Sequence, residues 1–139
     1  MDEPFDTKVA VVLLDDLPVW QKANATAFLV SGIAGSTPGL VGEAYVDGSG
    51  NRYLPMLRQP ILIYAADGTG LRRAYERAMA REVEQLSIFT RELFSTPNDA
   101  ANRAAVAAVQ AAELDLVGLA LRADRRVVDK VLDRLRPHP

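Results

Sequence analysis

A continuous apolar run from Lys8 to Leu14 constrains the fold of this chain more than any other feature. Its residues are Lys-Val-Ala-Val-Val-Leu-Leu, with no polar residue after the lysine. A strand with one solvated face alternates apolar and polar residues, whereas an uninterrupted run is typical of a strand covered on both faces of an α/β sheet. The run leads through Asp15, Asp16 and Pro18 into a helical pattern. Ligands usually bind at the carboxyl ends of strands in such sheets, so this junction is the first candidate for a site.

The helix expected after the junction mixes core residues with polar ones. Asp16 is predicted to cap it through its carboxylate, and Pro18 suits the first turn, where the backbone needs no intrahelical N–H partner. Gly32 and Gly35 are predicted to end it. On a helical wheel four residues share one face, with Trp20 at its edge, and this face is predicted to be the core stripe. The four residues are Val19, Ala23, Ala27 and Val30.

Three later apolar segments predict the other strands of the central sheet. They are Pro60–Ala65, Gln85–Thr90 and Leu116–Leu121. A helical pattern follows each of them, beginning at the caps Thr69, Thr96 and Asp124, and the second helix is expected to extend through Ala112. This alternation predicts a three-layer α/β sandwich with a mixed central sheet of about four strands and helices on both faces. No repeat or linker interrupts it, so residues 1–139 are expected to form a single domain.

Residues 36–58 are predicted to form a loop that carries a short hairpin. Its strands would be Gly42–Val46 and Arg52–Leu54, joined by the tight turn Asp47–Asn51. The turn faintly resembles a calcium loop, but positions six and twelve, which would need glycine and glutamate, are Arg52 and Arg58. We interpret the hairpin as a peripheral flap and not as a metal site.

Composition excludes several kinds of site. The chain has no cysteine, which rules out disulfides and thiolate metal ligands. Its one histidine, His138, stands between two prolines at the C-terminus, where we expect a frayed tail. A Ser-His-Asp triad and a histidine metal cluster are therefore excluded, while an all-carboxylate metal site is left open in principle. We expect neither a metal ion nor a cofactor.

The N-terminus and the hydropathy of the chain bear on its location. Met1–Pro4 is acidic and lacks the basic-then-apolar pattern of a signal peptide. No stretch approaches the roughly 18 apolar residues that a membrane span needs. We therefore expect a cytoplasmic protein without a membrane partner.

Basic residues recur at a spacing of four on two predicted helices. The rows are Arg73, Arg77 and Arg81, and Arg122, Arg126, Lys130 and Arg134. One interpretation is a surface for RNA or another polyanion. The other is a solvated face neutralised by neighbours such as Glu76, Asp129 and Asp133. The second is favoured because no aromatic residues interleave the rows as base-stacking platforms would, and because the net charge is −2.

Three polar residues of the first helix form the candidate site with Asp16. They are Lys22, Asn24 and Thr26. Asn and Thr compete with the helix for backbone hydrogen bonds, so a helix carries them at some cost. Lys22 is predicted at the flank of the helix, one turn from the strand end. Its amine would serve as an anion anchor or, if desolvated, as a general base. The alternative is an exposed lysine beside a boundary Asn.

The stretch Val11–Phe28 resembles the bacterial family known as "domain of unknown function 2000", whose fold is similar to that of the type II peptidyl-tRNA hydrolases. The order of the later strands and helices agrees as well, so the resemblance covers essentially the whole chain. It implies a peptidyl-tRNA hydrolase II-like fold, which is often dimeric.

The hydrolase motifs carry over only in part. The resemblance places Asp16-Leu17 on the Asp-Leu of the hydrolase turn and Lys22 on its functional lysine, if the turn here is one residue shorter. The hydrolase arginine, glutamine and histidine would stand at Leu14, Thr26 and Leu29. The Asp-Ala-Gly-x-Thr turn after the third strand is replaced by Arg91–Thr96, where Glu92 is a loose substitute.

Three hypotheses follow for function. The first is a domain with a cleft for a small anionic ligand or for catalysis, at the end of the first strand. Its candidate catalytic residues are Lys22 and Asp16, and its candidate binding residues are Asn24, Thr26, Glu92 and Thr96. The second is a peptidyl-tRNA hydrolase whose arginine rows contact tRNA phosphates. The third is a non-catalytic homodimer or interaction module, in which Trp20 and Asn24 serve packing.

Overall fold

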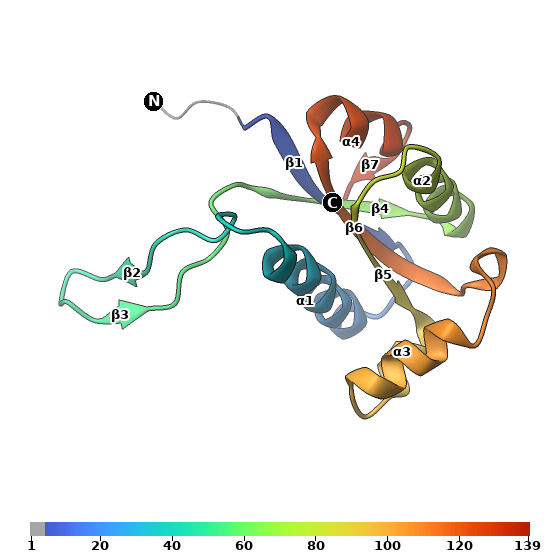
Figure 1. Ribbon diagram of the computed structural model, residues 1–139, viewed down its shortest axis with the longest axis horizontal. Helices are drawn as coiled ribbons and strands as arrows, with labels where there is room; N and C mark the ends of the chain where they lie inside the picture. The colour runs from blue at the N-terminus through green and yellow to red at the C-terminus, as the bar shows by residue number, and fades with distance from the viewer. Residues whose placement is uncertain (1–4) are drawn as a thin grey trace.

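A computed structural model describes residues 5–139 of the chain, and the acidic segment Met1–Pro4 lies outside the described residues. Figure 1 shows a central sheet flanked by helices, with a hairpin projecting from one end. The sheet strands are β1 (Thr7–Leu14), β4 (Ile61–Ala66), β5 (Gln85–Thr90), β6 (Leu116–Asp124) and β7 (Arg136–Pro137). The helices are α1 (Val19–Ser36), α2 (Gly68–Ala80), α3 (Asp99–Ala107) and α4 (Arg125–Val131), with short 3-10 turns η1 (Arg91–Ser95) and η2 (Ala111–Glu113). The hairpin is formed by β2 (Tyr45–Val46) and β3 (Arg52–Tyr53).

The sheet is mixed and has the order β5-β6-β1-β4-β7. β1 pairs with β4 in parallel and with β6 antiparallel, and β5 pairs with β6 antiparallel. β1, β4 and β5 therefore run in the same direction, and their carboxyl ends lie at one edge of the sheet. The mixed α/β architecture predicted from the sequence is confirmed.

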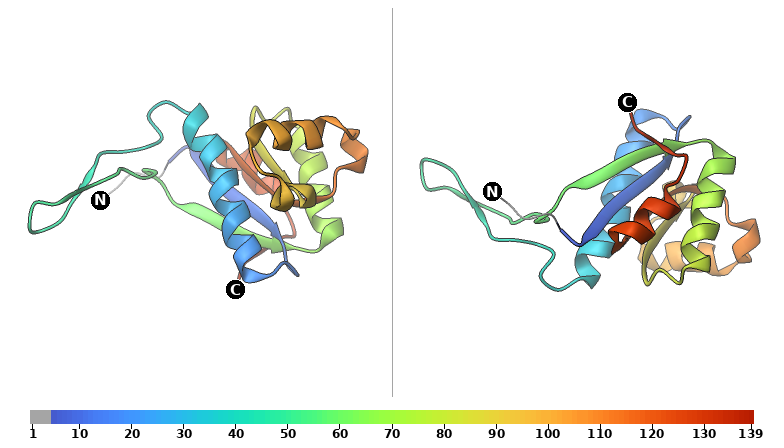
Figure 2. Two further views of the ribbon diagram at one scale, coloured as in Figure 1. Left: turned by 90° about the horizontal axis from the view of Figure 1, so that it is seen from below. Right: turned by 90° about the horizontal axis from the view of Figure 1, so that it is seen from above.

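The helices cover both faces of the sheet (Figure 2). α1 packs on one face, against β5, β6 and β1, while α2 and α4 pack on the other. α3 follows η1 beyond β5 (Figure 1). Within residues 5–139, no helix combines the length and the apolar character needed to cross a membrane.

The prediction of a frayed C-terminal tail was wrong. Arg136 and Pro137 pair with Ala65 and Tyr64 as the fifth strand, and the backbone N–H of His138 donates to Ile63 O at 2.9 Å. The count of about four strands was therefore one short. A two-residue strand has no periodicity of its own, and only its pairing with β4 identifies it.

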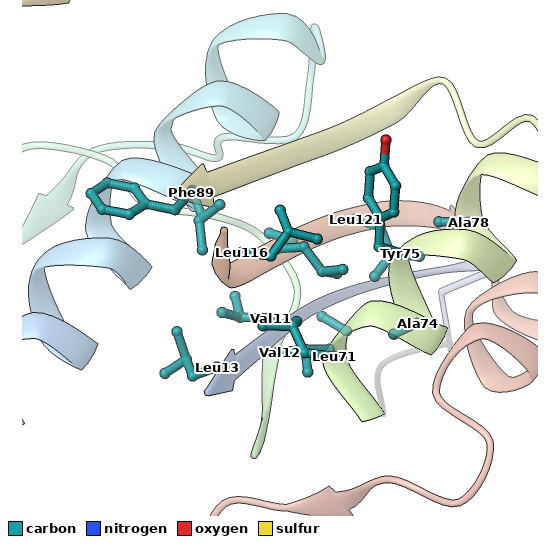
Figure 3. Packing of buried hydrophobic residues seen from close by; sticks show 14 of the residues in the cluster. Val11, Val12, Leu13, Leu71, Ala74, Tyr75, Ala78, Phe89, Leu116 and Leu121 are labelled. Carbon is teal, nitrogen blue, oxygen red and sulfur yellow. The ribbon is translucent and has the colours of Figure 1, made fainter. Parts of the chain in front are cut away.

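The core forms around β1. Every residue from Val9 to Leu14 is buried, as the apolar run predicted. Figure 3 shows Leu71, Ala74 and Tyr75 of α2 gathered against this strand and its neighbours. Each fully buried Val or Leu contributes about 1.5–3 kcal/mol relative to an exposed one, so the sheet and its helices are held mainly by this cluster.

The buried face of α1 differs from the predicted one. Ala25, Leu29 and Ile33 are buried, whereas Val19, Ala23 and Ala27, expected in the core, are exposed and Val30 is only partly buried. The physical reason is side-chain size. Burial of Leu and Ile at a spacing of four removes far more apolar area from water than burial of alanines, so the larger pair decides which face meets the sheet.

The ends of α1 were also predicted incorrectly. Pro18 occupies the N-cap position and no side chain caps the helix, so Asp16 does not have the capping role expected of it. The helix also continues through Gly32 and Gly35 to Ser36. A Cβ at Gly32 would lie 2.8 Å from Ser87 Oγ, so this glycine lets α1 approach β5 closely.

Two other caps lie at neighbouring positions to those predicted, and one is confirmed. Asp67, and not Thr69, accepts from Gly70 N at the start of α2. Asn98, and not Thr96, caps α3, which ends at Ala107 and does not reach Ala112. Asp124 caps α4 as expected, since it accepts from Arg126 N.

Candidate ligand-binding site

The carboxyl ends of β1 and β4 lie at a topological switch point of the sheet, where the connections after two neighbouring parallel strands leave to opposite faces. Leu14 and Ala66 are register partners at the ends of these parallel strands, and Asp15 N donates to Ala66 O at 2.8 Å. From here the chain continues into α1 on one face of the sheet and into α2 on the other (Figure 1). Adjacent parallel strands whose connections leave to opposite faces open a crevice, which is where ligands bind in open α/β sheets.

A polar cleft of about 440 Å³ lies at this point. Its walls come from the ends of β1 and β4, one side of α2 from Thr69 to Arg77, and the turn between α4 and β7. Its charged lining residues are Asp15, Asp67, Arg73, Arg77, Asp133, Arg134 and Arg136.

The backbone positions of these arginines are determined by α2 and by the turn between α4 and β7. The buried stripe of α2 faces the sheet, which leaves Arg73 and Arg77 one turn apart on the side of the helix that borders the cleft. Arg77 Nη1 donates to Asp133 O at 2.9 Å and so ties α2 to the turn after α4. Arg134 has a φ of 69°, the left-handed conformation that turns the chain from α4 toward β7.

The cleft has more basic than acidic side chains, and its guanidinium groups are not neutralised by ion pairs. The three salt bridges among residues 5–139 join Lys8 to Asp129, Arg91 to Asp115 and Arg103 to Asp99. None of them includes an arginine of the cleft. Of the acids in the cleft, Asp67 already accepts the N–H of Gly70 at 2.7 Å as the helix cap. Guanidinium groups that form no ion pair can hold a carboxylate or phosphate through paired hydrogen bonds.

Lys22 lies on the sheet side of α1, close to this end of the sheet. It continues the buried face one turn before Ala25 and is half-buried itself. Its Nζ lies 3.0 Å from Nε2 of His138. His138 bonds to the backbone of Ile63, so the C-terminal segment that forms one wall of the cleft at Arg136 also reaches Lys22.

The other candidates on the first helix contribute less. Thr26 Oγ1 donates to Lys22 O at 2.8 Å, which is the ordinary hydrogen bond of a threonine to its own helix. Asn24 and Asp16 are exposed. Asp16 adjoins Asp15, which lines the cleft, whereas Asn24 faces away from the sheet.

Glu92 and Thr96 do not converge with Lys22. Both belong to the segment around η1, which contacts the opposite flank of α1 through an edge-to-face pair of Trp20 and Phe94 at 5.7 Å. Trp20 and Lys22 are separated by about 200° around the helix. Thr96 Oγ1 donates to Leu93 O at 3.2 Å and contacts Asn102, while Glu92 is exposed.

Sequence reasoning missed Asp67, Arg136 and His138 as site residues. Asp67 comes two residues after the predicted strand Pro60–Ala65, a signal that was available. Arg136 and His138 carry no such signal, because their position depends on β7 pairing with β4. Across residues 5–139, no three His, Cys, Asp or Glu side chains come together as a metal site would need.

Comparison with known proteins gives a family and a structural relative of high similarity. A protein of unknown function from Agrobacterium tumefaciens strain C58 is 46% identical, with a TM-score of 0.94 over 98% of this chain and 100% of the other. A search of curated proteins found no match. The family model described as "Protein of unknown function (DUF2000)" matches residues 7–139. The chain therefore belongs to the DUF2000 family, as the block Val11–Phe28 predicted.

Proposed function

We propose that this domain binds a small anionic ligand, one that carries carboxylate or phosphate groups, in the cleft at the ends of β1 and β4. The observation that carries the proposal is the set of four arginines, Arg73, Arg77, Arg134 and Arg136, around one polar cleft at the switch point of the sheet. The arginines outnumber the three carboxylates of the cleft by one and form no ion pair with them, so a bound anion can pair with their guanidinium groups.

The two sides of the cleft suggest how the ligand is oriented. Arg73 comes from the middle of α2 and Arg77 from its last turn, and both lie on the side of the helix that borders the cleft. Arg136 comes from the opposite wall and is fixed by the pairing of β7 with β4. Asp15 and Asp133 can accept hydrogen bonds from hydroxyl or amino groups of the same ligand. A hydroxy acid or a phosphorylated metabolite fits this mixture.

A thermal-shift screen tests the proposal. Phosphate, pyrophosphate, citrate and a set of sugar phosphates are added to the wild type, to Arg73→Ala and to Arg136→Ala. A specific anion at about ten times its Kd should raise the wild-type Tm by about 4 °C. Both variants should lose that shift. Arg81→Ala removes the arginine at the C-cap of α2, which does not line the cleft, and this variant should keep the shift. Equal shifts in all four proteins would disprove the cleft as the binding site.

A second candidate is hydrolysis of peptidyl-tRNA, on a fold like that of the type II hydrolases. The observation behind it is the contact of Lys22 with His138. The first helix has Leu29 where a hydrolase histidine would be, but His138 places an imidazole beside the lysine from another part of the chain. Arginines of the cleft would then contact tRNA phosphates. Hydrolysis of the ester that joins the peptide to the tRNA, and so release of the peptide, should be lost in both Lys22→Met and His138→Asn.

This hydrolase candidate also needs salt-dependent binding of tRNA. A gel-shift series at low salt measures it, with Arg81→Ala again as the control variant. No retardation of tRNA and no hydrolysis would eliminate the candidate and leave the small-anion proposal untouched.

A further inference from the structure

The hairpin projects from the domain as an arm, which we define as residues 41–57. Figure 2 shows it extending away from the sheet and helices in two views from opposite sides. Backbone hydrogen bonds close its base, from Gly42 N to Met56 O at 2.9 Å and from Arg58 N to Leu40 O at 2.9 Å. Beyond the base its strands contain only two residues each.

The arm exposes apolar side chains, although a two-stranded hairpin is only marginally stable by itself. Leu54 is 84% exposed. The other large exposed hydrophobic residues of the arm are Val41, Tyr45, Val46, Tyr53 and Met56. An isolated two-stranded hairpin is marginally stable in water, and a contiguous apolar surface marks a contact with another molecule.

The outward side of α1 is the second exposed apolar surface. We define the outer face of α1 as Val19, Trp20, Ala23, Ala27 and Phe28. Val19 is 83% exposed, Trp20 60% and Phe28 54%. Contacts with Phe94 and Phe89 hold the two aromatic side chains in place, so the surface is pre-formed.

Charged residues are missing from this outer face. Between Val19 and Ser36 the only charged residue is Lys22, which lies on the sheet side of the helix. A solvated helix normally carries charges on its exposed side, whereas the centre of a protein interface is depleted of them.

We propose that the partner is a second copy of this chain, with the arm of each copy lying across the outer face of α1 of the other. The chain itself offers both surfaces, and a two-fold axis brings each arm to the other copy's helix in the same contact. The two strands of the arm border a hollow of about 990 Å³, lined by Gly42–Ala44 and Arg52–Pro55, which would face the helix of the other copy.

The exposed area matches what such a dimer needs. A half-exposed aromatic side chain offers about 100 Å², and an exposed aliphatic one a similar area. Eight such residues lie on the two surfaces, namely Val19, Trp20, Phe28, Tyr45, Val46, Tyr53, Leu54 and Met56. Complete burial of all eight would remove at most on the order of 800 Å² per copy from water, which is the area that a standard interface buries on each partner. The proposed dimer interface shares no residue with the anion cleft.

Light scattering coupled to size-exclusion chromatography measures the oligomeric state at about 1–100 μM. The wild type should have twice the 15.1 kDa mass of one chain. Ala27→Arg, in the middle of the outer face, and Leu54→Lys, on the arm, should each weaken the dimer about tenfold or more. Ala104→Arg on α3 and Met79→Lys on α2 change similarly exposed residues elsewhere and should remain dimeric. A wild-type monomer at all concentrations would overturn the proposal, as would dimers that tolerate both interface variants.

A crosslinking experiment identifies which surfaces meet. The chain has no cysteine, so Leu54→Cys and Ala27→Cys each introduce a single thiol. A short bismaleimide should join the two variants when they are mixed and refolded together, and should join neither variant to itself. Crosslinking of Ala27→Cys alone would show helix against helix and would contradict the placement of the arm. Circular dichroism confirms that each variant is folded.

Discussion

Lys22 and His138 are in contact although 116 residues separate them, with Nζ 3.0 Å from Nε2. A lysine ammonium has only donors, so Nε2 of the imidazole must accept. The other ring nitrogen, Nδ1, lies 3.0 Å from Pro139 O and must donate to it. The two contacts therefore select one tautomer of a neutral His138, with the proton on Nδ1.

Replacing Lys22 should remove the preference of His138 for this tautomer. At about pH 8, where an ordinary imidazole is neutral, the ring nitrogens of wild-type His138 should give ¹⁵N shifts of the Nδ1–H form. In Lys22→Met the Nε2–H form should become populated, because the donor that selects against it is gone. Lys8→Met is the matched control, since Lys8 pairs with Asp129 and not with His138. A wild type with a mixture of tautomers would contradict the contact.

The corrected orientation of α1 gives a prediction on stability. Leu29 is buried against the sheet and contacts the region of Gly118, so Leu29→Ala should lower the free energy of unfolding by about 2–5 kcal/mol. Val19→Ala, at a position that the sequence assigned to the core, should change it by less than about 0.5 kcal/mol in the monomer. Urea unfolding measures both at low protein concentration. A larger loss for Val19→Ala than for Leu29→Ala would restore the orientation first expected.

The sequence predicted those parts of the fold that depend on local pattern. The run Val9–Leu14 identified the central strand because a covered strand must be apolar at every position. The face of α1 was mistaken because alanines fit either a core or an exposed helix surface. The wall of the cleft at Arg136 could not be found, since a two-residue strand is defined by its pairing with β4 and by nothing within itself.

The candidate site, too, was predicted only where a local sequence pattern indicated it. Lys22 was singled out from its place on the first helix, and the structure puts it at the expected end of the sheet beside a histidine that the sequence had assigned to a tail. Arg73 and Arg77 were noticed as a row but assigned to a solvated face. The row becomes one wall of a cleft only because α2 contacts the turn after α4, which the sequence does not reveal.

Two glycines of α1 should respond differently to alanine. A Cβ added at Gly35 would meet no atom within 4 Å, so Gly35→Ala should stabilise the protein by about 0.5–1 kcal/mol through helix propensity. At Gly32 the new Cβ would lie 2.8 Å from Ser87 Oγ, so Gly32→Ala should gain less or become destabilising. Thermal unfolding of both variants checks the order. Adding Ser87→Ala should recover part of the difference, and no recovery would show that α1 and β5 are not in close contact there.

The tip of the arm should titrate at an unusually low pH. Hydrogen bonds from the Asn51 side chain and the Tyr53 hydroxyl, followed by backbone N–H groups, lower the pKa of Asp47 from 3.8 to about 2. The phenol of Tyr53 donates to that carboxylate at 2.8 Å, and this bond raises the pKa of Tyr53 above 10.0. Because the pKa of Asp47 is lower in the folded hairpin than in the unfolded chain, its contribution to the tip is complete above about pH 4 and is lost as pH falls toward 2.

NMR titration of the Asp47 carboxyl carbon measures this pKa directly. In Tyr53→Phe the phenol no longer stabilises the carboxylate, so the pKa of Asp47 should rise toward 3.8 while remaining below it, because Asn51 still donates through its backbone and side-chain N–H groups. Tyr45→Phe is the matched control, since Tyr45 is the register partner of Tyr53 in the hairpin and does not bond to Asp47. An unshifted Asp47 in the wild type would mean that the tip is open in solution, and the arm could then bind only by ordering on its partner.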